Sequence, residues 1–341
     1  MTKIKNMDEF AAASGVSRPT LSKYFHDHSS VRKSSRQKIE AALELYDYRP
    51  NLYAMNQNRK LTKNIGIVVP HLADPFFNEM SRTLELKCME AGFSPSLYSP
   101  YGDPTQENNI LDLLRSLKPA GVLIAPMGDR SDRRHLERFC KQVPTVLFDS
   151  DMPGIGEAFI GSDNHSFISQ SVEYLVRTGE PPLFFEMKNP ANPNAHRRHD
   201  AFIDSMNRLN LDPEIVQIDG DGCNIEEIGL RGAHDLLAGP TIPQKSILCS
   251  NDRLALGFLS AAYQKGLTVG RLPNHDLRVA SNDDHPFSKY TCPSLTTVAH
   301  DYHAVASQAL QTLIERIENG QATGDRKERR FPARLVLRDS A

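Results

Sequence analysis

Beyond residue 64, apolar residues come in short and nearly unbroken runs, separated by longer stretches of mixed character. Such runs predict buried strands of parallel sheets, and the amphipathic stretches between them predict helices covering both faces. Together they imply two α/β lobes. The runs lie at residues 65–69, 121–125, 145–148, 183–186, 215–218, 246–249 and 278–280.

The first sixty residues show a different pattern, that of short helices joined by a tight turn. Asn6 is followed three residues later by Glu9, which is the spacing of a helix N-cap and its capping box. Gly15 can adopt the positive φ that ends this helix. Val16 follows it in the turn, at the position where a side chain packs between two crossed helices. Ser17 is then placed to cap a second helix. The segment therefore predicts a helix-turn-helix.

The second of these helices carries small, polar and basic residues in its first two turns. A helix that reads DNA places such residues against base edges and phosphates. Proline is tolerated there because the N–H groups of the first turn have no intrahelical partner. The expected DNA-contacting residues are Ser17, Arg18, Pro19, Thr20, Ser22 and Lys23. An ordinary helical hairpin would share much of this pattern, so the two helices alone leave both interpretations open.

A third amphipathic helix is expected to begin between Arg32 and Ser35 and to end near Tyr48. The polar segment 52–60 follows it. A segment this short and polar is only a marginal helix in isolation.

Length and charge fit a division into a head and a larger body. At 341 residues the chain exceeds one ordinary domain and suits a small head with a two-lobed body. Residues 1–60 contain eleven Lys or Arg against six Asp or Glu, a net charge of +5, so the total of −2 leaves −7 for the remainder. A basic head attracts DNA phosphates in a salt-dependent way, and an acidic body is kept off DNA.

Other functional classes lack their signatures in this chain. No signal-peptide run follows Met1 and no apolar stretch approaches eighteen residues, so we expect a cytoplasmic protein without membrane segments. The five cysteines are scattered and lack CxxC spacing, and the histidines lack zinc-ligand spacing. Walker, nucleophile-elbow and GxGxxG motifs are missing. We therefore expect no enzyme activity, cofactor or metal.

Several motifs resemble the lactose-repressor/galactose-repressor (LacI/GalR) family of bacterial transcription regulators. Ala13-Ser14-Gly15-Val16-Ser17 with Thr20 and Ser22 is similar to the family's AGVS-x-x-T-x-S, and Tyr48-Arg49-Pro50-Asn51 is similar to its Y-x-P-N. The resemblance implies a three-helix DNA-binding domain at 1–50, a hinge helix and linker at 51–63, and a two-lobed, periplasmic-binding-protein-like domain for ligand binding and dimerisation at 64–341. It also implies a ligand cleft between the lobes, with the chain crossing near residues 161 and 290.

The resemblance further implies that the hinge helix contacts DNA, through Asn51, Tyr53, Ala54 and Gln57. In the family an apolar side chain of this helix enters the minor groove and wedges a base step open. The family's usual leucine falls on Gln57, whose amide makes a poor wedge. Whether this hinge kinks DNA is therefore open, and Met55 or Tyr53 is the alternative wedge.

Polar residues after the first and third runs are expected to line the cleft, because ligands bind outside the carboxyl ends of parallel strands. Asp74-Pro75-Phe76-Phe77 resembles the family's N-P-F-F, in which the polar residue bonds ligand hydroxyls and an aromatic ring packs on a sugar. Asp149 and Ser150 stand where sugar-binding relatives often have Asp-Arg, so Ser150 removes a cation. The resemblance thus implies ligand contacts at Asp74, Phe76, Phe77, Asp149 and Ser150.

Four further ligand contacts are implied in the second half of the chain, at Arg198, Asn251, Asp283 and His300. Arg198 matches the arginine of the family's R-x-x-G-F/W. Asn251 opens a segment close to N-D-x-x-A-x-G, with Asp252 expected as a structural cap. Asp283 is the carried-over cleft carboxylate, and His300 stands where relatives often have Gln. Taken singly, each fits a capping or surface role equally well, but their order along the chain favours a ligand role.

The carboxylates Asp74, Asp149 and Asp283 favour a neutral sugar, polyol or nucleoside-like effector, because carboxylates accept bonds from hydroxyls and repel phosphate. The resemblance implies a ligand-responsive transcription regulator, most often a repressor, that binds near-palindromic operator DNA as a homodimer or tetramer. Two alternatives stay open. One is a DNA-binding protein with a vestigial cleft, which the altered residues Asp74, Ser150 and His300 favour. The other is a sugar-binding protein without a role in transcription.

Overall fold

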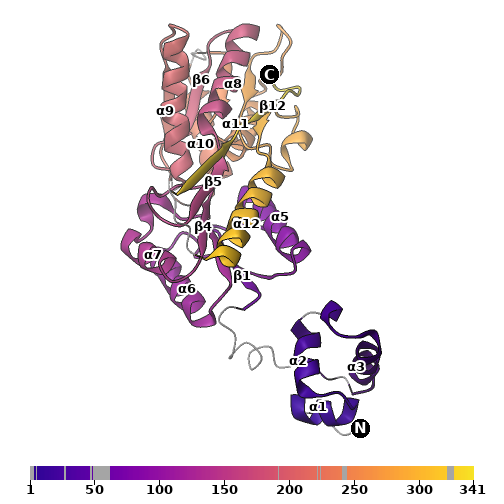
Figure 1. Cartoon of the computed structure of the whole chain (residues 1–341). Coiled ribbons are helices and arrows are strands. Elements are labelled where there is room, and N and C mark those ends of the chain that lie inside the picture. The colour runs from indigo at the N-terminus through magenta and orange to yellow at the C-terminus, as the bar shows by residue number, and fades with distance from the viewer. Residues whose placement is uncertain are drawn as a thin grey trace. The chain divides into compact units, whose positions relative to one another are not determined.

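The structure is a computed structural model of the chain, which divides into two units (Figure 1). The first unit comprises Met1–Thr62 and the second Lys63–Ala341. The described residues are 4, 6–26, 28–46, 48, 62–190, 192–220, 222, 224–239, 244–320 and 326–341. The predicted hinge helix at 51–63 falls almost wholly outside them.

Among its described residues, the first unit contains three α-helices and a short 3-10 helix, and α1 begins and ends at the residues that the sequence predicted. Helix α1 (Met7–Ser14) begins after Asn6, whose Oδ1 accepts from the backbone N of Glu9 at 2.9 Å. The side-chain Nδ2 of Asn6 also donates to Glu9 Oε1 at 2.9 Å. Gly15, with a φ of 64°, ends the helix. The elements α2 (Arg18–His26), the 3-10 helix η1 (His28–Ser30) and α3 (Lys33–Tyr46) follow.

The core of this unit is built around aromatic rings. Phe10 is fully buried and stacks on Tyr48 with 4.4 Å between ring centroids. Leu21 and Tyr24 bring one face of α2 into the same core, and Val16 packs against it from the turn. Burial of these residues fixes which face of α2 points to solvent. The predicted three-helix head is confirmed.

The first lobe of the second unit is a six-stranded sheet with helices on both faces. Its strands are β1 (Asn64–Val68), β2 (Ser94–Tyr98), β3 (Gly121–Ile124), β4 (Thr145–Phe148), β5 (Ala158–Ser162) and β11 (Lys327–Phe331). Its helices are α5 (Pro75–Glu90), α6 (Pro104–Leu117), η2 (Gly128–Arg130), α7 (Arg133–Cys140) and α12 (Tyr302–Asn319). The strand order is β11-β5-β4-β3-β1-β2, and all neighbours are parallel.

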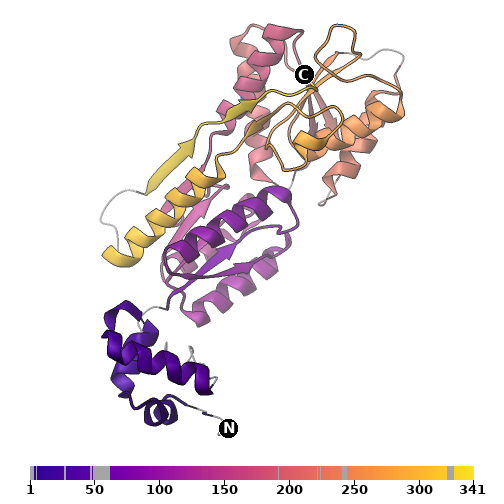
Figure 2. The same ribbon diagram turned by 90° about the vertical axis from the view of Figure 1, so that its right-hand side faces the viewer.

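Separate apolar clusters hold the helices to the two faces of this sheet. Side chains of α5 and α12, such as Leu84 and Leu313, pack on one face around Ile67. Leu114 of α6 and Phe139 of α7 pack on the other face. Figure 2 shows α12, coloured gold, running along this lobe. Burial on both faces explains why the strands read as continuous apolar runs.

The second lobe repeats the design with a four-stranded parallel sheet in the order β7-β6-β8-β9. Its strands are β6 (Leu183–Met187), β7 (Glu214–Ile218), β8 (Ser246–Cys249) and β9 (Arg278–Ala280). Its helices are α8 (Asn164–Thr178), α9 (Pro193–Arg208), α10 (Ile225–Leu236), α11 (Asp252–Gln264) and the 3-10 helix η3 (Ser288–Tyr290). Helices α10 and α11 pack on one face of the sheet, and α8 and α9 on the other.

The chain passes between the lobes three times. It leaves the first lobe after β5, near residue 162, and returns near residue 300, between β10 (Thr297–Ala299) and α12. The third passage runs from β11 to β12 (Arg334–Val336), which pairs antiparallel with β10. Figure 2 shows this last passage as the two yellow arrows. The predicted second crossing near 290 is thus ten residues early, and the third was not predicted.

All seven predicted strands are confirmed, with ends that shift by at most one residue. The strands that sequence reasoning missed are β2, β5, β10, β11 and β12. Strand β11 reads Lys-Glu-Arg-Arg-Phe and forms the edge of its sheet, where an apolar run is not needed. Within the described part of the chain, none of the helices combines the length and the apolar character needed to cross a membrane.

Candidate functional site

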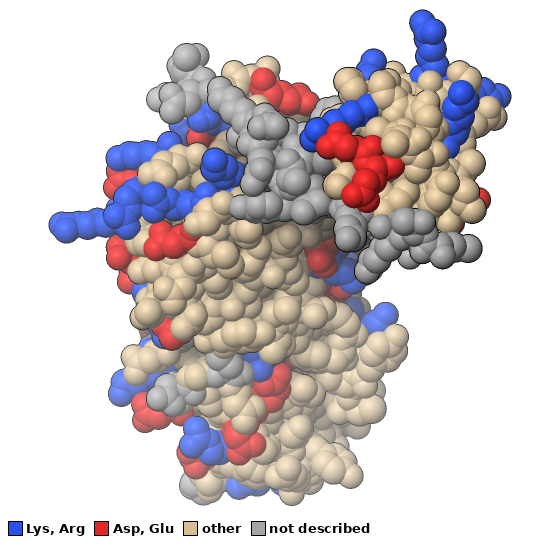
Figure 3. Space-filling model, turned by 90° about the horizontal axis from the view of Figure 1, so that it is seen from below, with Lys and Arg blue, Asp and Glu red and all other residues tan. Residues whose placement is uncertain are grey.

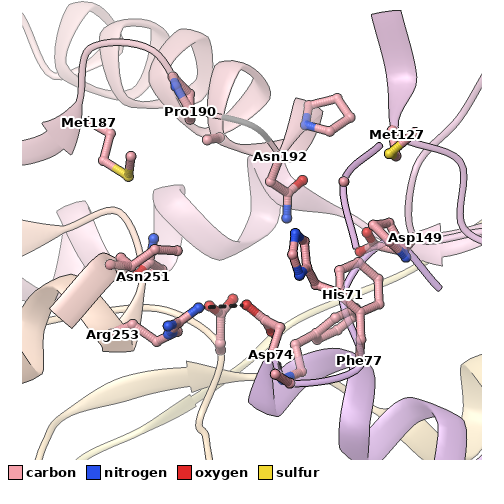
Figure 4. A pocket seen from close by; sticks show the side chains of 18 of the residues that line it. His71, Asp74, Phe77, Met127, Asp149, Met187, Pro190, Asn192, Asn251 and Arg253 are labelled. Atoms are coloured by element: carbon pink, nitrogen blue, oxygen red, sulfur yellow. Dashed lines mark hydrogen bonds and ion pairs between the residues drawn. The ribbon is translucent and has the colours of Figure 1, made fainter. Parts of the chain in front are cut away.

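The carboxyl ends of strands from both lobes surround one cavity of about 160 Å³ (Figure 4). Eight of the nine predicted ligand residues lie in its lining, namely Asp74, Phe76, Phe77, Asp149, Arg198, Asn251, Asp283 and His300. Ser150 does not, and this placement was wrong. Asp149 has a φ of 58°, and the turn that it makes leaves Ser150 only 1% exposed, enclosed by the protein.

Arg198, on α9, is the centre of a buried polar network. Its Nε donates to Oδ1 of Asn164 at 3.1 Å, and its Nη1 to the backbone O of Ser250 at 2.7 Å. Its Nη2 donates to Oδ1 of Asp283 at 2.6 Å. A guanidinium has five N–H groups, so these three bonds hold it in place and leave two N–H groups for a ligand.

Asp283 is the anionic partner in this network. Besides the bond from Arg198, its Oδ1 lies 3.2 Å from Nε2 of His300, and its Oδ2 lies 3.7 Å from Nε2 of His285. Burial alone would raise the pKa of this carboxyl, but the charge of Arg198 and the bond from His300 together hold the pKa well below its usual range. Asp283 is therefore ionised throughout the physiological pH range.

His300 lies at the second passage between the lobes and contacts both of them. Its ring centroid is 4.8 Å from that of Phe76, in α5, and 4.5 Å from that of Phe167, in α8. Its Nδ1 lies 2.8 Å from Oγ of Ser162. Burial lowers the pKa of His300, so the ring is neutral near pH 7. In the tautomer that fits both bonds, Nε2–H donates to Asp283 and Nδ1 accepts from Ser162.

Asp149, at the end of β4, is bonded to the opposite lobe. Nδ2 of Asn194, in α9, donates to Oδ1 of Asp149 at 2.9 Å and to its backbone O at 3.2 Å. Burial raises the pKa of Asp149 to about 7, with Arg198 opposing the shift and Asp283 adding to it. Asn164 links Asn194 to Arg198, through a bond of 3.2 Å to Asn194 Oδ1. One chain of hydrogen bonds thus joins Asp149 to Asp283.

Asp74 precedes α5 and is already engaged by protein partners. Its Oδ1 accepts from the backbone N of Phe76 at 2.9 Å, which caps the helix. Its Oδ2 accepts from Nη1 of Arg253 at 3.1 Å. Arg253 in turn makes two bonds of 2.7 Å to Glu226. The sequence expectation that Asp74 is an open acceptor for ligand hydroxyls needs this correction, because much of its bonding capacity is used within the protein.

Asn251 combines the cleft position expected for it with the capping role expected for Asp252. Oδ1 of Asn251 accepts from the backbone N of Leu254 at 2.9 Å, so Asn251 is the N-cap of α11 while it also lines the cavity. Asp252 is fully buried and binds three groups from the loops around it. These are the backbone N of His285 at 2.9 Å, Ser288 Oγ at 2.5 Å and Thr297 Oγ1 at 2.6 Å.

Comparison with known proteins matches both units of the chain. Residues 6–51 match the bacterial regulatory proteins of the lacI family, and residues 172–341 match the periplasmic binding protein-like domain. The chain belongs to the lacI family. The resemblance that the sequence motifs indicated is thereby confirmed.

Relatives of this lacI-family chain are named as repressors. The HTH-type transcriptional repressor PurR of Mannheimia succiniciproducens is 27% identical, over 100% of this chain and 98% of the relative. The ribose operon repressor of Escherichia coli is also 27% identical, over 91% and 92%. The structure of the Lac repressor dimer bound to operator and the anti-inducer ONPF has the same fold, with a TM-score of 0.81, 23% identity and 99% of each chain covered. This chain is accordingly a DNA-binding transcription regulator.

The DNA-binding residues expected in a lacI-family head lie on the solvent face of α2. Thr20 is half-buried, and the exposed residues are Ser17, Arg18, Pro19, Ser22 and Lys23. The guanidinium of Arg18 lies 3.1 Å from Asp8 of α1, and its side chain is 63% exposed. Figure 3 shows Lys and Arg side chains on the surface, with Asp and Glu between them. Four predicted contacts, Asn51, Tyr53, Ala54 and Gln57, lie outside the described residues.

Several cavity residues of this lacI-family chain were missed by sequence reasoning, chiefly His71, Met127, Met187, Arg253 and His285. His71, Met127 and Met187 follow or end strands, so extending the strand-end rule by a few residues would have found them. Arg253 and His285 carry no such signal. They line the cavity because the turn of α11 and the loop after β9 place them there, which only the fold reveals.

Proposed function

We propose that this lacI-family regulator is a repressor whose DNA affinity responds to a small polyhydroxylated molecule bound between the two lobes. Residues 1–50 bind DNA, residues 51–63 form the hinge, and residues 64–341 bind the effector and a second subunit. The operator is near-palindromic and the protein is a homodimer or a tetramer. A relative named as the ribose operon repressor supports this proposal, and so does the Lac repressor dimer bound to operator.

The observation that carries the proposal is the buried network of Arg198, Asp283 and Asp149 on the cavity wall. Buried polar groups are costly unless they are bonded, and here protein partners fix each group in position. The hydrogen bonds described above use three N–H groups of Arg198 and only Oδ1 of the Asp149 carboxyl. Fixed donors and acceptors with spare capacity suit the hydroxyl groups of a sugar, polyol or nucleoside.

Size and charge also favour a neutral effector. A cavity of about 160 Å³ is about ten times the roughly 10–15 Å³ that a single water molecule requires, so it has room for a small organic ligand. Phe76 and Phe77 offer aromatic faces to a sugar ring or base. Two of the cations that line the cavity, Arg198 and Arg253, are already paired with carboxylates. The third, Arg130, donates to the backbone O of Gly102. The cavity thus favours the neutral effector that the sequence indicated. The reason differs, because here it is the pairing of the cavity's cations, and not repulsion by its carboxylates, that disfavours an anion.

On the DNA side, the exposed face of α2 reaches only a few base pairs. Two copies related by two-fold symmetry double the contact set and match a palindromic site. Such a protein acts where the chromosome is, in the bacterial cytoplasm. Neither its relatives nor its cavity calls for a catalytic step, and we propose none.

A mobility-shift assay with the DNA flanking the gene tests this function, followed by calorimetric titration with a panel of sugars, polyols and nucleosides. We expect a specific complex whose midpoint shifts when one member of the panel is added, in either direction. Absence of any sequence-specific complex at low salt would contradict the DNA role. A specific complex without any response to the panel would favour the second candidate below.

The second candidate is a DNA-binding regulator with a vestigial cleft. One observation favours it: Asp74 is used to cap α5 and to bind Arg253. Calorimetry separates the two candidates, because a vestigial cleft gives no heat with any ligand while operator binding persists. A sugar-binding protein without a role in transcription is opposed by the DNA-binding head.

A further inference from the structure

An ion pair between two residues that line the cavity joins the two lobes directly. Asp74 belongs to the first lobe, where it precedes α5, and Arg253 belongs to the first turn of α11 in the second lobe. Arg253 Nη1 lies 3.1 Å from Asp74 Oδ2, and the side chains are 12% and 21% exposed. Figure 4 shows this contact as a dashed line between the two lobes. Partial burial weakens the screening that makes most surface pairs ineffective.

Both ends of the pair are fixed within their own lobes. The second carboxylate oxygen of Asp74 caps α5 through the backbone N of Phe76. On the other side, Nε and Nη2 of Arg253 hold both oxygens of Glu226, in α10, in a fork of two 2.7 Å bonds. Bidentate bonds of this kind set the plane of a guanidinium. Little side-chain entropy is therefore lost when Asp74 and Arg253 form their ion pair. Whether the pair forms depends mainly on the distance between the two lobes.

We propose that the Asp74–Arg253 pair is a latch that holds the cleft closed when no effector is bound. In a two-lobed sensor, an effector acts only through a difference in its affinity for the closed and open states. A latch built into the protein biases that equilibrium before any effector arrives. The inference concerns regulation of the cleft assigned above and rests on that proposed function, but the closure itself is a property of the ligand-free protein.

The latch differs from the buried polar contact that also joins the lobes beside the cavity. Asp149 and Asn194 join the lobes within the buried network that continues to Arg198 and Asp283. That network is enclosed, whereas the latch is the more exposed contact and stands apart from it. Breaking the latch should therefore loosen the cleft without disrupting the network.

Hydrogen exchange of the full-length, ligand-free protein, followed by mass spectrometry, tests the latch. The variants are Arg253→Gln, Asp74→Asn and the double variant. Asparagine caps a helix as well as aspartate does, so Asp74→Asn removes the ion pair and keeps α5 intact. Arg82→Gln is the matched control, because Arg82 pairs with Glu79 on the same helix and does not reach the second lobe.

We expect amides in 71–78 of the first lobe and 249–255 of the second to exchange about two- to fivefold faster in each single variant, the range for a partly exposed ion pair. The double variant should add nothing, because both changes remove the same bond. Unchanged exchange at 71–78 in Arg253→Gln would overturn the proposal, and so would additive effects. Faster exchange confined to α10 and α11 would mean that Arg253 stabilises only the packing of its own lobe, and this result would also overturn the latch proposal. The assay needs neither DNA nor effector, so its failure is distinct from failure of the proposed function.

Discussion

Arg198 Nη2 lies 2.6 Å from Asp283 Oδ1, and the two side chains are 8% and 9% exposed. Both residues line the cavity, and each partner also bonds other buried groups. Removing one partner of a buried pair leaves the other charge without compensation, which costs more than the pair itself contributes. Arg198 and Asp283 therefore stabilise the fold, in addition to the ligand role proposed for them.

Arg198→Ala is expected to lower the free energy of unfolding by about 3–5 kcal/mol, because Asp283 would remain buried and charged. Urea unfolding followed by circular dichroism measures this loss. Arg208→Ala on the same helix is the control, since Arg208 is exposed and its removal should cost within about 0.5 kcal/mol. A loss below about 1 kcal/mol for Arg198→Ala would show that the site relaxes and that the pair is not structural.

Gly257→Ala is expected to destabilise the second lobe by about 1–3 kcal/mol, the usual cost of overpacking. A Cβ atom at this position would lie 2.2 Å from the backbone O of Glu226 and 2.4 Å from the backbone N of Leu230. Both contacts are to the backbone of α10, which cannot move aside like a side chain. Gly266→Ala gives a comparison at a glycine without a close neighbour, where only the positive φ of 73° opposes the change. Equal thermal stability of Gly257→Ala and the natural protein would contradict the close approach of α10 and α11.

The pH dependence of stability should contain a contribution from Asp149. Its pKa is raised from 3.8 in the unfolded chain to about 7 in the folded protein. The folded state therefore keeps a proton that the unfolded state releases, and stability falls as pH rises from about 4 to about 7. Asp149→Asn keeps an acceptor for Asn194, tolerates the positive φ and removes this loss. Unfolding midpoints should agree near pH 4 and favour the variant at pH 8; parallel pH curves would refute the assignment.

Much of the architecture was predictable because buried strands and helix ends have recognisable patterns in the local sequence. The seven apolar runs became strands, and the N-cap Asn6 and the turn residue Gly15 marked the ends of α1. Motifs similar to those of the family, several of them just after strand ends, placed eight of the nine expected ligand residues in the lining of the cavity. Contacts between segments far apart in the sequence have no such local pattern. Arg253 pairs with Asp74, 179 residues away, and the sequence around either residue does not predict this ion pair.

Roles within the cleft were harder to predict than positions. Ser150 follows a cleft aspartate, yet the left-handed backbone of Asp149 encloses it. Asn251 and Asp252 are adjacent, and which of them caps α11 depends on loops that arrive from residues 285 to 297. Periodicity and spacing describe one segment at a time, so they do not determine how three loops share a single carboxylate.

Arg18→Ala is expected to weaken operator binding by about 1–3 kcal/mol and to relax preference at one base pair, because a guanidinium pairs bidentately with guanine. In the free head Arg18 lies 3.1 Å from Asp8 with both side chains largely exposed, so DNA can replace that partner at little cost. Asp8→Ala is the control and should keep the base preference. Competition binding against single-base operator variants measures both. Uniform weakening on every sequence would make Arg18 a phosphate contact and pass the specificity role to Lys23.

His300→Gln is expected to change how stability depends on pH. Burial lowers the pKa of His300 below 6.5, its value in the unfolded chain. The unfolded state therefore gains a proton below about pH 6.5 that the folded state does not, and stability is lost as pH falls from there. The groups that face the ring are Asp283, Arg198 and His285.

Glutamine does not titrate, and its amide can still donate to Asp283 and accept from Ser162, as the neutral ring does. It loses the ring contacts with Phe76 and Phe167, which contribute about 0.5–1.5 kcal/mol. The variant should therefore be less stable than the natural protein at pH 8, and the difference should shrink steadily towards pH 5. Urea unfolding at half-unit pH intervals measures this. If the difference in the free energy of unfolding between the two proteins were constant from pH 8 to pH 5, His300 would contribute through its packing contacts only. The lowered pKa of its imidazole would then not account for a loss of stability in acid.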